Sequence, residues 1–224
     1  MTRGQIDKLP NAGIASLGSL AKLPSDFVVP TLNPDTLSRL RAQAALQQVR
    51  RKTGEGRVEV LPLVQGRGGD RMPPANAADL FFDMEGDPLF EGGLECLFGF
   101  VHAVDGLERF TPFWAHDRGA EKVAFGVAVD FIVAHLAANP GAHIYHYAAY
   151  EETALKRLAM YHGTLETEVD DILRRGQLID LCRVVRDAIR TSEPGYSIKN
   201  LEAFYLDGGR GGEVKTRWRQ HRYV

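Results

Sequence analysis

Hydrophobic and polar residues alternate in the middle of the chain in short blocks that are typical of strands. Apolar runs at 81–84, 94–101 and 110–114 are separated by Glu91-Gly92-Gly93 and by Asp105-Gly106. An Asp-Gly pair favours the tight turn of a two-stranded hairpin, because both residues tolerate positive φ. The pattern therefore predicts three consecutive strands that form an antiparallel meander.

Helical spacing begins after the third run. Residues 121–138 predict a long amphipathic helix that Asn139-Pro140-Gly141 ends. The positions expected to point inward are Val123, Val127, Phe131, Ile132 and Leu136.

Two more predicted strands alternate with shorter predicted helices. The strands are at 143–147 and 178–181, and the helices are at 151–162, 167–175, 182–190 and 197–205. The resulting order is βββαβα, followed by a further strand and helices. An antiparallel meander that leads into crossover-linked strands is the element order of the RNase H-like fold, an α/β class with a mixed sheet flanked by helices.

The part of the chain before residue 79 has a different pattern. The turn at Ala12-Gly13-Ile14 between helical positions resembles half of a helix-hairpin-helix module, which either offers backbone amides to a phosphate or packs without a ligand. Asn33-Pro34-Asp35-Thr36 then opens a helix that carries a basic face. The predicted regions are a helical helix-hairpin-helix-like region at 1–52, a Gly- and Pro-rich linker at 53–78, and a C-terminally incomplete RNase H-like domain at 79–224.

Composition and charge exclude several classes of protein. The chain has 27 Lys and Arg against 29 Asp and Glu, a net charge of -2, so any contact with a polyanion must be local. No apolar run reaches the roughly 18 residues of a membrane span, and the first five residues lead into polar sequence rather than the apolar region of a signal peptide. We therefore expect a cytoplasmic protein that does not bind a membrane. Cys96 and Cys182 lack the spacing of a zinc site and are expected to be core thiols.

Two carboxylates lie within and directly after the first predicted strand. Asp83 and Glu85 are two residues apart in Leu80-Phe81-Phe82-Asp83-Met84-Glu85, so they leave the same face of a strand. Ionised acids at the centre of a sheet are costly unless they are paired or bound to metal. One interpretation is a site for a hard cation, and the other is that Asp83 ends the strand before a solvated turn.

A third carboxylate is expected at the same place. Glu151 heads the helix that follows the strand at 143–147, and in the predicted order this strand lies beside the first. Three converging acids suit phosphodiester hydrolysis in which two Mg²⁺ or Mn²⁺ ions about 4 Å apart activate water and stabilise the leaving oxygen. Zinc chemistry is less favoured, because His143 and His146 point to different faces of a strand.

Four segments carry a resemblance to a known family, namely residues 82–88, 93–99, 145–151 and 196–202. They resemble the RNase H-like, DEDD-type exonuclease domain of the bacterial RecB-like nuclease family, in which this domain precedes a superfamily 1 DNA helicase. The resemblance covers most of 79–205. It implies a two-metal 3′ to 5′ exonuclease acting on DNA, with Mg²⁺ or Mn²⁺ as cofactor, a helicase region as partner and a place in DNA repair.

The resemblance also assigns residues. Asp83 and Glu85 match the DxE motif, and Glu151 stands where the second acidic motif carries an aspartate. Asp180 matches an acid on the following strand, with a helix cap as the alternative role. Lys199 matches a Ser-Ile-Lys pattern and either contacts a phosphate or is solvated.

The end of the chain departs from this resemblance. The family's last aspartate, with its nearby tyrosine or histidine, has no counterpart here, and the residues after Gly208 do not follow the family pattern. Because glycines dominate 208–212, we expect weak order from Gly208 onward. The missing acid leaves a second hypothesis open, an inactive or truncated module that binds nucleic acid or docks beside a helicase.

Overall fold

The structure is a computed structural model that describes residues 3–206. It divides into two compact units, the first containing the described residues up to Pro62 and those from Ala188 onward, the second containing Leu63–Asp187. This division differs from the predicted regions, because the second unit begins inside the predicted linker and the residues after Asp187 join the N-terminal segment. The expectation of weak order from Gly208 lies outside the described residues.

Three helices begin the first unit: α1 (Arg3–Asn11), α2 (Leu17–Ala21) and α3 (Pro34–Thr53). Gly13 turns the chain between α1 and α2 with a φ of 79°, a left-handed conformation that favours glycine. The side chain of Asn33 caps α3 by accepting hydrogen bonds from Asp35 and Thr36. The helices bury a small apolar cluster of their own, made of Leu9, Ile14, Leu20, Val29, Leu32, Leu37 and Ala44.

The first unit also contains a two-stranded sheet. Strand β1 (Val58–Val60) pairs antiparallel with β7 (Ile189–Thr191), and Arg190 forms an ion pair with Glu59 at 2.6 Å. The helix predicted at 182–190 was therefore too long, because backbone pairing with a distant segment converts its last residues into a strand.

A short helix and a 3-10 turn complete the described part of the first unit. Helix α8 (Ile198–Leu201) is followed by η2 (Glu202–Phe204), where one helix had been predicted at 197–205. The carboxylate of Glu193, between β7 and α8, is buried and forms an ion pair with Arg50 of α3. Arg50 therefore has a structural partner and is not simply part of a solvated basic face.

The second unit is built on a five-stranded sheet in the order β4-β3-β2-β5-β6. Strands β2 (Leu80–Asp87), β3 (Leu94–Val104) and β4 (Leu107–Trp114) form the predicted antiparallel meander, and Asp105-Gly106 makes its turn with φ of 51° and 77°. Strands β5 (Ile144–His146) and β6 (Leu178–Asp180) are parallel to β2 and to each other. Strand β2 is central, as the element order predicted. A 3-10 helix, η1 (Gly68–Arg71), precedes the sheet.

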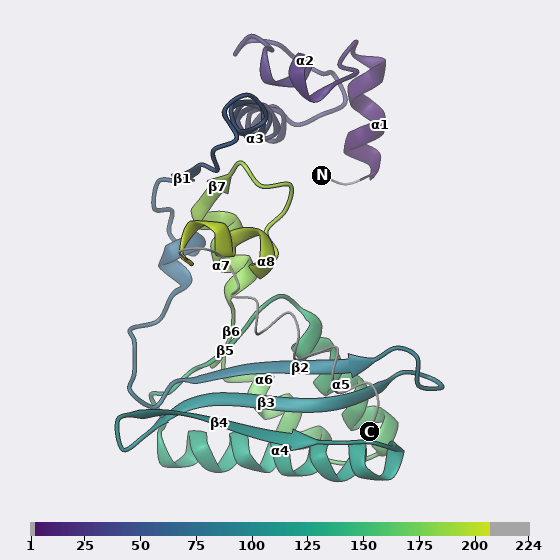
Figure 1. Ribbon diagram of the computed structural model, residues 1–224, viewed down its shortest axis with the longest axis vertical. Helices are drawn as coiled ribbons and strands as arrows, with labels where there is room; N and C mark the ends of the chain where they lie inside the picture. Colours follow the sequence, from purple (N-terminus) through teal and green to yellow (C-terminus); the bar gives the residue numbers. More distant parts are fainter. Residues whose placement is uncertain (1–2, 207–224) are drawn as a thin grey trace. The chain divides into compact units, whose positions relative to one another are not determined.

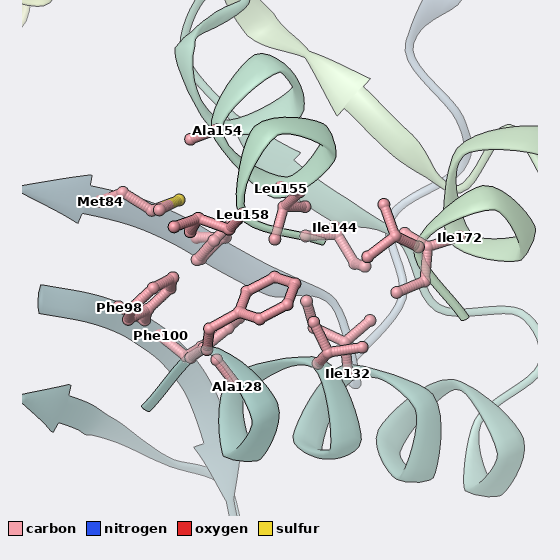
Figure 2. Packing of buried hydrophobic residues seen from close by; sticks show 14 of the residues in the cluster. Met84, Phe98, Phe100, Ala128, Ile132, Ile144, Ala154, Leu155, Leu158 and Ile172 are labelled. Carbon is pink, nitrogen blue, oxygen red and sulfur yellow. The ribbon is translucent and has the colours of Figure 1, made fainter. Parts of the chain in front are cut away.

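Helices cover one face of this sheet. They are α4 (Arg118–Ala138), α5 (Tyr150–His162) and α6 (Glu166–Arg174), and the short α7 (Leu181–Ala188) follows β6. Figure 1 shows α4 running along the strands, and Figure 2 shows Phe98 and Phe100 of β3 facing Ala128 and Ile132 of α4. Burial of these apolar side chains holds the helices on the sheet, at about 25 cal/mol per Å² of apolar surface removed from water.

The inward face of α4 differs from the predicted one. Ile132 and Leu136 are buried as expected and Phe131 is partly buried, but Val123 and Val127 are 65% and 45% exposed. Phe125 and Ala128 point inward in their place, with no exposed surface. The helix is apolar around most of its circumference, so its period alone did not select a face. On the buried face, Phe125 packs against Phe98 of the sheet.

Among residues 3–206, no helix is both long enough and apolar enough to cross a membrane.

Candidate functional site

The acidic pair lies on β2, on the face of the strand opposite to the helices. Leu80, Phe82 and Met84 are buried toward α4 and α5, so the alternation of the strand turns Phe81, Asp83 and Glu85 the other way. Asp83 is exposed and Glu85 is half-buried. The strand continues as far as Asp87, so Asp83 does not end it and the segment is not simply a solvated turn.

Glu151 comes from the second residue of α5. A sharp turn between β5 and α5, where Ala148 has a φ of 75°, redirects the chain at the end of β5, which is the parallel neighbour of β2. The Glu151 side chain is buried and makes a hydrogen bond with Asp83. The pairing of β2 with β5 therefore brings an exposed and a buried carboxyl group into contact.

A histidine supports Glu151 from the side of β5. Nδ1 of His146 lies 3.2 Å from Oε2 of Glu151, and both side chains are buried. An imidazole that bonds a carboxylate in this way fixes the orientation of the carboxylate. The sequence pattern had considered His146 only as an unfavourable zinc ligand; its proximity to Glu151 depends on the turn at Ala148, which no local pattern indicates.

Burial and two neighbouring carboxyl groups shift the pKa of Asp83. Partial burial, followed by the nearby charges of Glu151 and Glu85, raises the pKa of Asp83 from 3.8 to about 6. The hydrogen bond to Glu151 acts in the same direction, because it requires one of the two groups to be protonated. Without a cation, the site thus holds mutually repelling acids.

Asp180 has the capping role that was one of its two expected interpretations. Its Oδ1 accepts hydrogen bonds from the backbone N–H of Arg183 at 3.2 Å, in the first turn of α7, and from that of Ala148 at 3.0 Å. The second bond holds the strained turn that leads into α5 and Glu151. A role of Asp180 as a metal ligand stays a prediction.

The carboxylates of Asp83, Glu85 and Glu151 are suitable ligands for a hard divalent cation, but the three groups are not gathered around one point. Oxygen ligands from carboxylates suit Mg²⁺ and Mn²⁺, and a cation would relieve the repulsion that raises the pKa of Asp83. In the described part of the chain, however, no group of three or more Asp, Glu, His or Cys side chains is gathered closely enough to hold a metal ion. Asp83 and Glu151 meet, and Glu85 would have to turn toward them.

Lys199 belongs to the other compact unit. It is exposed in α8, whereas Asp83, Glu85, Glu151 and Asp180 all lie in the second unit. Its suggested contact with a phosphate stays a prediction.

Two residues of the site region were missed by sequence reasoning. Tyr150 directs its hydroxyl group to the carboxylate of Glu95, which is buried in β3. The available signal was a charged residue inside the apolar run at 94–101, which is unusual unless the charge is paired.

The raised pKa of Asp83 predicts a specific pH dependence. The unfolded chain has the ordinary pKa of 3.8 and the folded protein a pKa of about 6, so between these values the folded state binds the extra proton. The contribution of Asp83 to stability therefore falls as pH rises from about 4 to above 6. With a chelator present, Asp83→Asn should become relatively more stable than wild type as pH rises through this window, measured by melting temperature. Parallel curves for the two proteins would contradict the assignment.

Comparison with known proteins agrees with this architecture. Residues 80–220, more than half of the chain, match the family model of the RNase H superfamily. The chain belongs to the RNase H superfamily, and its mixed α/β sheet is the fold expected of that group. No curated protein and no solved structure matches the chain. The family match continues to residue 220, so it includes much of the segment after Gly208 that was expected to depart from the family pattern.

Proposed function

We propose that this chain is a divalent-metal-dependent nuclease that hydrolyses phosphodiester bonds in DNA. Asp83, Glu85 and Glu151 would hold Mg²⁺ or Mn²⁺, and Asp180 would hold the turn that presents Glu151. Membership of the RNase H superfamily supports nucleic acid as the substrate class.

The observation that carries the proposal is the contact between Asp83 and Glu151. An exposed acid on the central strand meets a buried acid on the helix that follows β5. Partial burial raises the pKa of Asp83, and the charge of Glu151 raises it further. A carboxyl group with a raised pKa that faces a second carboxyl group is a candidate for a functional site. The fold accommodates this repulsion, which a bound cation would remove.

The two acids in contact would have different roles, because they differ in exposure. Asp83 is exposed and can reach a cation that arrives from solvent, whereas Glu151 is buried and oriented by His146. A bound divalent cation supplies activation of water and neutralises charge on the phosphate. The protein's contribution is to keep the acids in place before the cation arrives, because a prearranged site avoids the cost of ordering them during the reaction.

The finer features of the proposal rest on the resemblance to the RecB-like nuclease family. They are the preference for DNA over RNA, the 3′ to 5′ direction of an exonuclease of the DEDD type, and a helicase region as partner in DNA repair.

A second candidate function has its own observation. No three-residue metal cluster is formed among the described residues, and the family's last acid has no recognisable counterpart in the sequence. Both features favour a module that binds nucleic acid, or docks beside a helicase, without cutting. Exposed basic residues such as Arg39, Arg51 and Lys52 in α3 offer local phosphate contacts, which would weaken with salt.

Cleavage assays separate the two candidates. Single-stranded DNA and RNA labelled at either end are incubated with the protein in Mg²⁺, Mn²⁺ or chelator, and we expect DNA to shorten from its 3′ end only when a cation is present. Glu151→Gln should reduce cleavage to background. The matched control is Glu152→Gln, which alters the neighbouring exposed acid that pairs with Lys156 and should leave cleavage unchanged. DNA that binds at low salt but is never cut would favour the second candidate.

A further inference from the structure

A buried carboxylate on β3 accepts hydrogen bonds from the helix that carries Glu151. Glu95 is 4% exposed, and its two oxygens lie 2.9 and 2.8 Å from the hydroxyl group of Tyr150, the first residue of α5. The guanidinium group of Arg157, two turns further along α5, forms an ion pair with the same carboxylate. The backbone N–H of Glu95 donates to buried Glu121 at 2.7 Å. The carboxylate of Glu95 is thus buried and hydrogen-bonded, and both of its side-chain partners, Tyr150 and Arg157, lie on α5.

Strand β2, which carries Asp83 and Glu85, leaves space for the hydrogen bond between Tyr150 and Glu95. Its register with β3 shifts between Glu85 and Gly86, and Gly86 then lies opposite Glu95. A Cβ atom on Gly86 would stand 2.7 Å from the Tyr150 hydroxyl and 3.1 Å from Oε2 of Glu95. The glycine therefore leaves the space that the tyrosine hydroxyl occupies, one residue after Glu85.

These contacts tie the beginning of α5 to β3, which is the antiparallel neighbour of the strand that carries Asp83 and Glu85. Tyr150 immediately precedes Glu151, so a displacement of Tyr150 moves the backbone of Glu151 with it. The turn before α5 is a strained one, with Ala148 at a φ of 75°, and such a turn persists only when surrounding contacts fix it. Asp180 holds this turn from β6, and Glu95 holds it from β3.

We infer that Glu95 and Tyr150 form a positioning pair that sets the approach of Glu151 to Asp83, with Gly86 providing the space for it. Neither residue is assigned a contact with substrate, so the pair acts through Glu151. The inference rests on the proposed function, because the contact of the two acids is the part of the site that would receive the cation.

Two substitutions disrupt the hydrogen bond between Tyr150 and Glu95 in different ways. Tyr150→Phe deletes only the hydroxyl group, and Gly86→Ala displaces that hydroxyl group while Tyr150 remains intact. Gly86 has no positive φ that alanine would strain, and the clashing atom is the end of a side chain, so the variant can fold by moving Tyr150. The control is Glu152→Gln, which breaks an exposed pair on the same turn of α5.

The main measurement is the Kd for Mn²⁺, by calorimetry at a temperature where every variant is folded. We expect both Tyr150→Phe and Gly86→Ala to weaken Mn²⁺ binding about tenfold, the lower end of the usual effect of removing a group that orients a ligand. Glu152→Gln should retain the wild-type Kd. If Tyr150→Phe and Gly86→Ala lower the melting temperature but keep the wild-type Kd, the pair is only structural and the inference is wrong.

A second measurement keeps the inference testable if the proposed function fails. Should the wild-type protein bind no Mn²⁺, the proposed function is contradicted, and crystal structures of the metal-free wild type and Tyr150→Phe then decide the positioning role. We expect the contact between Asp83 and Glu151 to be present in the wild type and lost in Tyr150→Phe. A contact retained in Tyr150→Phe would overturn the inference.

Discussion

Asp83→Asn is expected to abolish both cleavage and the response of the protein to Mn²⁺. In the wild type, a cation that binds only the folded state stabilises it by about 2.7 kcal/mol when its free concentration is 100 times the Kd. Asparagine removes the charge that attracts the cation, so this stabilisation should disappear. Without metal, Asp83→Asn should be at least as stable as the wild type, because the repulsion from Glu151 and Glu85 is relieved.

Asp180→Asn is the informative comparison for this experiment. Asparagine keeps a carbonyl oxygen that can accept from Arg183 and Ala148, so loss of the cap should cost about 1 kcal/mol or less. If Asp180 is only a cap, the Mn²⁺ response of this variant stays as in the wild type; if it is also a ligand, the response is lost. Melting temperatures with and without Mn²⁺ give both results, and an unchanged response in Asp83→Asn would end the catalytic proposal.

Phe125→Ala is expected to lower the free energy of unfolding of the second unit by about 3–5 kcal/mol, the usual cost of removing a large aromatic side chain from a core. Phe125 has no exposed surface and packs against Phe98, with ring centroids 6.4 Å apart. Val123→Ala, on the exposed side of the same helix, should change stability by about 0.5 kcal/mol or less.

Urea unfolding followed by tryptophan fluorescence measures both effects. The sequence contains two tryptophans, Trp114 and Trp218, so a Trp218→Phe background assigns the signal to Trp114 of β4 in the second unit. The comparison also tests which face of α4 packs on the sheet. Equal losses in Phe125→Ala and Val123→Ala, or a larger loss in Val123→Ala, would mean that α4 packs through the face that its hydrophobic pattern suggested.

Local sequence determined the strands of the meander and the direction of the first acids. The Asp105-Gly106 turn depends only on the conformations that these two residues tolerate, and it formed where predicted. The alternation along β2 depends only on the period of a strand, so Asp83 and Glu85 share a face away from Phe82 and Met84, as expected. Both features are settled within a few neighbouring residues.

The packing of α4 and the end of α7 were decided by tertiary structure. Helix α4 is apolar on more than one side, so only the shape of the sheet selected Phe125 in preference to Val123. The residues after Ala188 became strand β7 because β1, more than a hundred residues away in the chain, supplied backbone partners. Helical periodicity carries no information about a distant partner.

The candidate site depends on both the local sequence and the tertiary structure. The sequence predicted the three acids of the candidate site, because carboxylates beside apolar strands are costly unless they are paired or bound to metal. The contact of Asp83 with Glu151 depends on the parallel pairing of β2 with β5, on the strained turn at Ala148, and on the bonds that Glu95 and Asp180 make to the start of α5. The strand pairing and the two side-chain contacts join residues that lie far apart in the chain, so only the folded structure places Glu151 against Asp83.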